Sequence, residues 1–208
     1  MSNNEIIVDK RNVGKTTFLY NEIVKGYSNY NFIVLDSATD HVDKSLLKKV
    51  VNTYNDAVVI YTENLSQIVI NNMKIEEYKK VYKNYFPFHE IITNMNKIMC
   101  FDLSYFLEKA YDELENNNSE ELYNYYRRKY NNLSQQIIAC IVLMNKEGLL
   151  NSVHVIMDEI ELPIVDYDLN VLQDDVSFLA SVHPENSFGT FYQSFTRARF
   201  KPYIKKGW

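Results

Sequence analysis

Cysteine, glycine and proline are scarce in this 208-residue sequence, and each shortage narrows what the chain can be. The two cysteines, Cys100 and Cys140, lie far apart in apolar surroundings, which is typical of reduced, buried thiols. No disulfide framework or zinc site has the spacing that it needs, because the four histidines are scattered as well. With only five glycines and four prolines, we expect few long irregular loops.

The sequence also lacks a long apolar run and an excess of positive charge. No stretch approaches the roughly 20 apolar residues that span a bilayer. Residues 1–5 have neither a cationic start nor an apolar run of signal length, so we expect a cytoplasmic protein without membrane association. The net charge of −5 provides no global basic field, so charge does not support nucleic acid as a partner.

What remains is a composition typical of one globular domain over residues 1–208, with 46% hydrophobic and 24% charged residues. Apolar runs that indicate strands alternate with helical patterns, which predicts an α/β fold with a mainly parallel sheet flanked by helices. Strands are expected at 5–8, 31–35, 57–61, 97–103, 153–157 and 176–182. Helices are expected at 16–25, 44–53, 105–115 and 119–147, with two more at 68–82 and 88–95 in a helical insertion over 64–96.

The most informative segment is 6–17, which joins the first expected strand to the first expected helix. Backbone N–H groups at the start of a helix point at an anion, and the helix dipole adds partial positive charge there. The segment therefore predicts a phosphate site, in which Lys15 reaches the β- and γ-phosphates and the Thr16 hydroxyl ligates Mg²⁺. A solvated loop before an ordinary helix is the alternative, but the apolar strand before it and the helical spacing after it favour a phosphate site. The predicted nucleotide-binding residues here are Asn12, Val13, Gly14, Lys15, Thr16 and Thr17.

A second informative segment is the apolar run 153–157, which ends in two adjacent carboxylates, Asp158 and Glu159. Asp158 is the predicted metal residue, and Glu159 is the predicted catalytic residue that polarises water for attack on a γ-phosphate. Taken alone, the pair is more commonly explained as a solvated strand end. The occurrence of both segments, in this order, favours the nucleotide interpretation.

Together the two segments resemble the Walker A and Walker B motifs of P-loop NTPases. The Walker A pattern is G-x-x-x-x-G-K-S/T, and it is degenerate here because its first glycine falls on Asp9. A Cβ and a carboxylate at that position are unfavourable where the backbone must turn close to a polyphosphate. The resemblance implies a three-layer P-loop NTPase fold, with ATP and Mg²⁺ as cofactors and Lys15 in a catalytic role.

The expected strand at 176–182 extends this resemblance. In additional-strand, catalytic-glutamate (ASCE) P-loop ATPases, a further strand follows Walker B and ends in a polar sensor beside the γ-phosphate. Ser181, His183 and Asn186 are the candidates for that role, and an ordinary polar loop is the alternative. The motifs, though not the whole chain, are also similar to those of HerA/FtsK-type motors, through segment 100–104, and of AAA-type ATPases.

Near the C-terminal end, five cations between residues 197 and 206 reverse the sign of an otherwise acidic chain. In P-loop enzymes, a late arginine often neutralises the transition-state phosphates, in cis or across a subunit boundary. Arg197 and Arg199 are the candidates for this catalytic role. The alternative is a solvated basic tail, or a surface for an acidic partner.

Two further segments leave alternatives open. The polar turn 36–41 is expected at the same rim of the sheet as the phosphate loop, where it would contact substrate or a metal-bound water. It would equally serve as an N-cap for the helix at 44–53. Segment 123–130 interleaves tyrosines with cations, as base stacking would require. In an acidic chain, tyrosines packed against the sheet, with cations extending into water, are favoured.

Three functions are compatible with these residues. The first is Mg-dependent ATP hydrolysis coupled to conformational change, in a homo-oligomer or on a protein partner. The second is a P-loop small-molecule or nucleoside kinase, which Glu159 disfavours because a phosphotransferase must exclude water instead of activating it. The third is a degenerate nucleotide-binding interaction module without turnover, which the substitution at Asp9 would explain.

Overall fold

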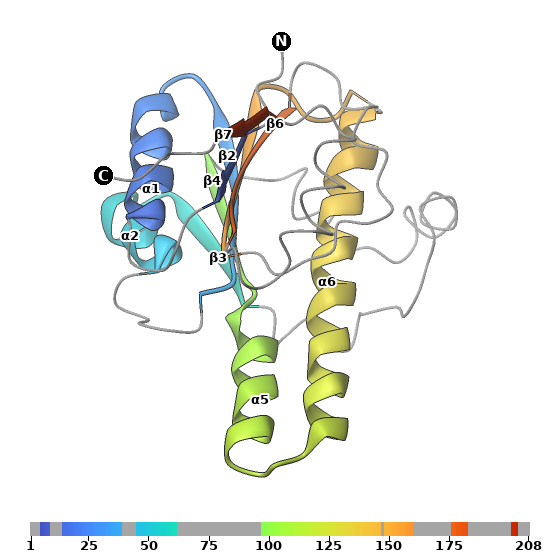
Figure 1. Ribbon diagram of the computed structural model, residues 1–208. Helices are drawn as coiled ribbons and strands as arrows, with labels where there is room; N and C mark the ends of the chain where they lie inside the picture. Colours follow the sequence, from blue (N-terminus) through green and yellow to red (C-terminus); the bar gives the residue numbers. More distant parts are fainter. Residues whose placement is uncertain are drawn as a thin grey trace.

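The computed structural model describes residues 5–8, 14–38, 45–61, 97–146, 148–159, 176–182 and 201–203. They form three layers, with a parallel sheet between helices on its two faces (Figure 1). The α/β class and the flanked parallel sheet predicted from the sequence are therefore confirmed. The expected helical insertion over 64–96 lies outside the described residues.

Within the described residues, the sheet has seven strands in the order β3-β4-β2-β5-β6-β1-β7, and every neighbouring pair is parallel. The strands are β1 (Glu5–Val8), β2 (Asn31–Asp36), β3 (Ala57–Tyr61), β4 (Ile98–Asp102), β5 (Val153–Asp158), β6 (Val176–Val182) and β7 (Lys201–Tyr203). The six expected strands all form, within one residue at each end. The short strand β7 was not predicted, because Pro202 argues against a strand except at a sheet edge, where β7 lies.

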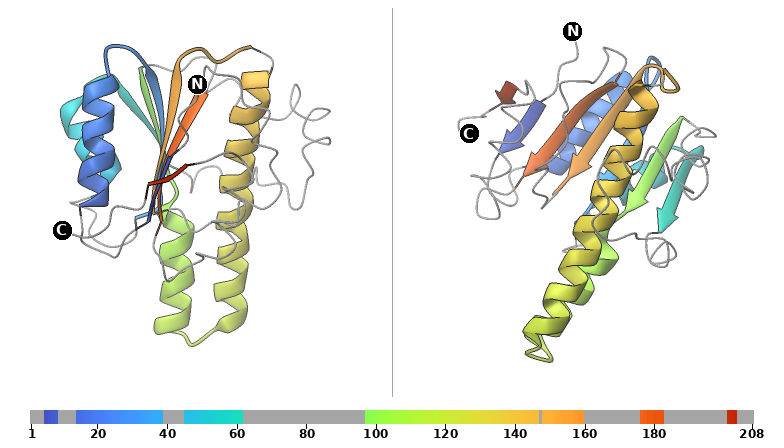
Figure 2. Two further views of the ribbon diagram at one scale, coloured as in Figure 1. Left: turned by 45° about the horizontal axis from the view of Figure 1, so that its top comes forward. Right: turned by 90° about the vertical axis from the view of Figure 1, so that its right-hand side faces the viewer.

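Four helices are described: α1 (Lys15–Gly26), α2 (Leu46–Thr53), α5 (Ser104–Glu115) and α6 (Glu120–Lys146). Helices α1 and α2 cover one face of the sheet and α6 covers the other (Figures 1 and 2). Helix α5 begins after the carboxyl end of β4 and runs beside the first half of α6. The two helices form a hairpin that extends past the carboxyl ends of the strands. These four helices match the predicted ones to within two residues.

The core explains why the two longest apolar strands carry no polar alternation. Strands β2 and β5 lie in the middle of the sheet, where helices cover both faces, and such strands are continuously apolar. On α1, Leu19 and Ile23 are four residues apart and both fully buried against this sheet. Cys100 and Cys140 are buried free thiols, as predicted.

The tyrosine-rich part of α6 divides between core and surface. Tyr130 is fully buried, and its hydroxyl lies 2.8 Å from Ser37 Oγ at the end of β2. Tyr125 is 46% exposed, and the Lys129 ammonium lies 5.5 Å from the centre of its ring. The buried tyrosine agrees with the expected amphipathic helix, and it ties α6 to the carboxyl rim of the sheet.

Candidate functional site

Three aspartates end three adjacent strands at one rim of the sheet. Asp36 on β2 is in register with Asp102 on β4 at one side and with Asp158 on β5 at the other. Neighbouring strands lie about 4.8 Å apart, so the three backbones form a short row. Main-chain bonds fix the row: Leu103 N–H donates to the Asp36 carbonyl (2.8 Å), and Ser37 N–H donates to the Asp158 carbonyl (3.1 Å).

Asp158 is the buried centre of the site. Its side chain has no exposed surface, and the Ser181 hydroxyl donates to Oδ1 at 2.5 Å. The same hydroxyl oxygen accepts the Glu159 N–H at 3.0 Å, so Ser181 links both carboxylate residues. Oδ2 is buried and has no hydrogen-bond partner among the described residues. A buried, unsatisfied acceptor oxygen is costly in a folded protein and therefore needs an explanation.

The start of α1 lies against Asp158. Burial raises the pKa of the Asp158 carboxyl, while the hydroxyls of Ser181 and Thr16 and the Lys15 ammonium oppose that rise. Lys15 itself is only 7% exposed. The fold thus brings Lys15 and Thr16 next to Asp158, although they are far apart in the sequence, and these are the residues predicted to hold phosphate and metal.

Gly14 precedes α1 in a left-handed conformation, with φ 85°. Glycine adopts this conformation without strain, whereas other residues do so at a cost. A Cβ built on Gly14 would meet no atom within 4 Å, so the space in front of it is open. Because glycine has no side chain, Gly14 itself does not cap the helix. A helix start without a side chain at its N-cap position is suited to an anion.

Glu159 is the first residue after β5, and its backbone is strained. Its φ of 52° lies in the left-handed region, which costs a non-glycine residue about 1–3 kcal/mol. The N–H of the same residue is held by Ser181, whose hydroxyl oxygen accepts it. Strain of this kind persists only where the surroundings enforce it, and it marks Glu159 as a positioned residue.

Asp36, one strand away, is held differently. Its Oδ1 accepts the Ala38 N–H at 3.0 Å, and its Oδ2 accepts the Leu47 N–H at 2.8 Å in the first turn of α2. Ser45 Oγ also accepts an amide of that turn, from Lys48 at 3.2 Å. Of the two roles left open for the turn after β2, helix capping is therefore the one that Asp36 performs. Burial, followed by the charge of Asp158, raises the pKa of Asp36 to about 7.

Several predicted residues lie outside the described part of the chain: Asp9, Asn12, Val13, His183, Asn186, Arg197 and Arg199. Sequence reasoning missed Asp102, the third member of the row, and did not foresee that Ser181 bridges Asp158 and Glu159. The signal for Asp102 was present, because the expected strands at 31–35, 97–103 and 153–157 all end at or next to an aspartate.

Within the described residues, no group of three or more His, Cys, Asp or Glu side chains converges as a metal site. None of their helices has the length and apolar character needed to cross a membrane. In comparisons with protein-family models, curated proteins and solved structures, nothing matches this chain. The functional assignment therefore rests on the geometry of the site.

Proposed function

We propose that this chain binds Mg·ATP at the start of α1 and hydrolyses it, as a P-loop ATPase of the ASCE class. The observation that carries the proposal is the meeting of Lys15 and Thr16 with the buried carboxylate of Asp158. A cation, a hydroxyl and a carboxylate at a helix start are the groups that a metal-bound triphosphate requires.

The residues present fit Mg²⁺. The Thr16 hydroxyl and the Asp158 carboxylate offer the oxygen ligands that Mg²⁺ prefers, and the Asp158 Oδ2 atom has no other partner among the described residues. A single carboxylate suffices, because Mg²⁺ in such sites is held by one or two carboxylates together with phosphates and water. When bound, the ion would neutralise charge on the phosphates.

The protein's own groups then divide the work. Lys15 offers charge-assisted hydrogen bonds to the phosphates, and Gly14 leaves room for them. Ser181 holds Asp158 and the Glu159 backbone in one frame, as a positioning residue. The Glu159 carboxylate would accept a proton from the attacking water. Arg197 and Arg199 keep their proposed role at the transferring phosphate.

The strand order supports the ASCE assignment. Strand β6 follows β5 in the sequence, yet it lies between β5 and β1 in the sheet. Its carboxyl end therefore separates the strand that precedes the phosphate loop from the strand that ends in Asp158. Ser181 at that end has the position that a polar sensor requires. His183 and Asn186 remain further candidates for the same role.

The expected output is conformational, within a homo-oligomer or on a protein partner in the cytoplasm. Two alternatives remain in competition with hydrolysis: phosphoryl transfer to a small molecule or nucleoside, and nucleotide binding without turnover. They differ in what happens to the γ-phosphate, so one set of measurements separates all three.

The experiment measures ATP affinity and phosphate release for wild type and Glu159→Gln, and then phosphate transfer to a nucleoside panel. We expect Mg-dependent phosphate release by wild type, and turnover lower by about 10²–10⁴-fold in Glu159→Gln with ATP binding retained. Glu115→Gln, on the exposed end of α5, is the matched control. Equal turnover in all three proteins would remove Glu159 from catalysis. Transfer without hydrolysis would establish the kinase, and binding without either would establish the interaction module.

A further inference from the structure

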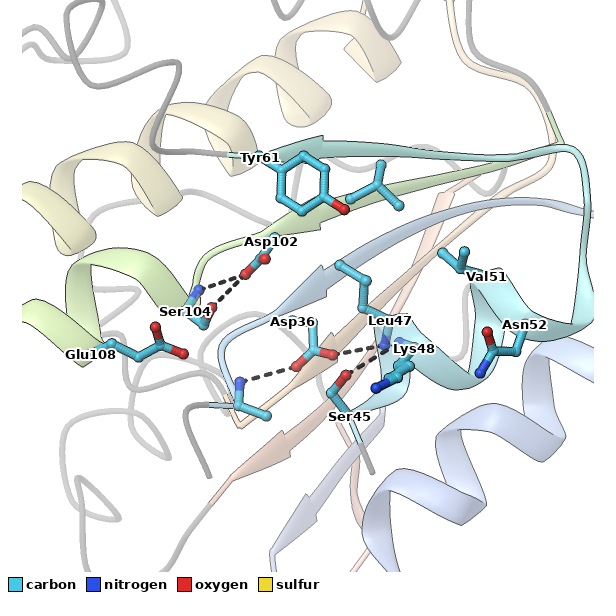
Figure 3. A pocket seen from close by; sticks show the side chains of 12 residues that line it. Asp36, Ser45, Leu47, Lys48, Val51, Asn52, Tyr61, Asp102, Ser104 and Glu108 are labelled. Carbon is cyan, nitrogen blue, oxygen red and sulfur yellow. Dashed lines mark hydrogen bonds between the residues drawn. The ribbon is translucent and has the colours of Figure 1, made fainter. Parts of the chain in front are cut away.

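A cavity of about 320 Å³ opens beside Asp36, on the opposite side from Asp158. Most of its lining side chains come from β2, β3 and β4, from α2 along its length and from the first two turns of α5 (Figure 3). This volume is at the lower end of the range for small-molecule pockets, about 300–1,000 Å³. The cavity shares Asp36 and Asp102 with the row of aspartates but includes none of Lys15, Thr16 or Asp158.

The position of the cavity in the fold favours a ligand site. Strands β2 and β4 are neighbours, but the chain leaves β2 toward α2 and leaves β4 toward α5 and α6. Helices α2 and α6 lie on opposite faces of the sheet (Figure 2). In open α/β sheets, ligands bind at the carboxyl ends of strands where neighbouring connections diverge in this way.

The lining has an apolar wall and a polar wall. Leu47, Val51 and Val59 form the apolar one, and Tyr61 closes it from the end of β3 (Figure 3). The polar wall contains Asp36, Asp102, Ser104 and Glu108, and Ser45, Lys48 and Asn52 add polar side chains on the side of α2. A site with this division holds an apolar body on one side and orients a polar group on the other.

The polar wall has acceptor capacity to spare. Asp102 Oδ1 accepts both the Ser104 N–H (3.0 Å) and the Ser104 hydroxyl (2.7 Å), so the hydrogen bonds of Asp102 within the described residues all use one oxygen. Glu108 lies on the next turn of α5 and faces the same space (Figure 3). Burial, followed by the negative charge of Asp102, raises the pKa of Glu108, while the Ser104 hydroxyl and the charge of Lys109 oppose that rise.

The charge of the lining decides which ligands fit. Asp102 and Glu108, together with Asp36 in its ionised form, face one ammonium, that of Lys48, so the cavity disfavours phosphates and carboxylates. A bare metal ion fits poorly as well, since no three metal-binding side chains of the described residues converge. A larger cation with an apolar body would satisfy both walls.

We propose that this cavity binds a small organic cation, with its ammonium or guanidinium group at Asp102 and Glu108 and its apolar part against Leu47, Val51 and Val59. This binding goes beyond the proposed ATPase and does not require it. The ligand lies beside Asp36, whose carboxylate neighbours Asp158, so an occupant is also close enough to affect the candidate nucleotide site.

The test uses three probes with one apolar body and different head groups: n-hexylamine, 1-hexanol and hexanoate. Binding is followed by methyl chemical shifts of the protein, without nucleotide and with EDTA present. We expect saturable shifts of the Leu47, Val51 and Val59 methyls with the amine, weaker shifts with the alcohol and none with the acid. Equal shifts with all three probes, or no saturable binding to the folded protein, would overturn the proposal.

Variants locate the cation. Asp102→Asn keeps an oxygen for the Ser104 bonds but removes the charge, and Glu108→Gln removes a charge from an exposed position. Each should weaken amine binding by roughly tenfold, the loss expected for one hydrogen bond to a charged group. Glu115→Gln, at the exposed far end of α5, should leave it unchanged. Unchanged amine affinity in both Asp102→Asn and Glu108→Gln would exclude this cavity. Since no nucleotide is present, failure of ATP hydrolysis would not affect the result.

Discussion

Asp36 and Asp158 are the same residue type in the same register on adjacent strands, and both are buried, yet their surroundings differ. Asp36 accepts two backbone N–H groups, one on each oxygen, and the second of these belongs to α2. Asp158 accepts a side-chain hydroxyl on Oδ1, and its Oδ2 has no partner within the described residues.

The comparison separates a carboxylate that maintains the fold from one that is available to a ligand. A carboxylate whose oxygens are both bonded to the main chain cannot leave those bonds without exposing buried N–H groups, which is costly. A carboxylate oriented by a hydroxyl, with one oxygen unsatisfied, offers that oxygen at no such cost. By this criterion Asp158, and not Asp36, is the carboxylate available to a ligand.

The strongest way to break the comparison is to neutralise each aspartate in turn. Asp158→Asn should lower Mg-dependent ATP turnover by about 10²–10³-fold, the loss expected for one charge-stabilising group. Asp36→Asn should affect turnover far less, because Asp36 stabilises the start of α2. Steady-state phosphate release measures both. An equal loss of turnover in two folded variants would mean that the aspartates act as one unit.

The pH dependence of stability should also distinguish Asp36 from Asp158. Because its pKa is raised from 3.8 to about 7, folded Asp36 retains a proton that the unfolded chain releases. The protonated Asp36 carboxyl contributes a stabilisation that is fully present below about pH 4 and is lost as the pH rises through 7. Between pH 5 and 8, we expect this loss to lower the free energy of unfolding by about 2–3 kcal/mol. Urea unfolding in EDTA should show this slope in wild type and a flatter one in Asp36→Asn. An unchanged slope would place the proton elsewhere.

Much of this framework could be predicted from the sequence. Continuous apolar runs located the central strands, and helical spacing located the helix that follows β1. The rule that parallel strands share one rim also placed Asp36 at the same edge as the phosphate loop. These inferences work because burial of apolar faces dominates local structure, and burial follows a period that can be read directly.

The partners of each aspartate could not be predicted, because they depend on strand order. Strand β4 follows β3 in the sequence but lies between β3 and β2, which brings Asp102 beside Asp36. Strand β6 is inserted beside β5, which brings Ser181 to Asp158. No local pattern encodes these insertions. They decide which carboxylate oxygens are satisfied, and hence which aspartate is available to a ligand.

Lys15 provides a test of the candidate nucleotide site around Asp158. Lys15→Ala should weaken ATP affinity by at least about tenfold, because the phosphates lose charge-assisted hydrogen bonds. Calorimetry with Mg·ATP measures the change. Lys25→Ala is the matched control, since Lys25 lies at the far end of the same helix and pairs with Glu22 on the surface. Unchanged affinity in a folded Lys15→Ala protein would contradict the phosphate site.

The smallest predicted effect concerns Ser37, which connects the backbones of Asp36 and Asp158. Ser37 follows Asp36, and its N–H donates to the Asp158 carbonyl, while its hydroxyl pairs with Tyr130 on α6. Tyr130→Phe would leave the buried Ser37 hydroxyl without this partner, which should lower the free energy of unfolding by about 1–3 kcal/mol.

Tyr125→Phe, at an exposed position of α6, should stay within about 0.5 kcal/mol of wild type and serves as the control. If the two aspartates act separately, Tyr130→Phe should keep wild-type ATP affinity despite its lower stability, since the bond between Tyr130 and Ser37 involves neither Lys15 nor Thr16. A matching loss of affinity would instead mean that α6 supports the nucleotide site through Ser37. The hairpin of α5 and α6 would then be mechanically connected to the site, which is the connection that an ATPase acting on a partner needs.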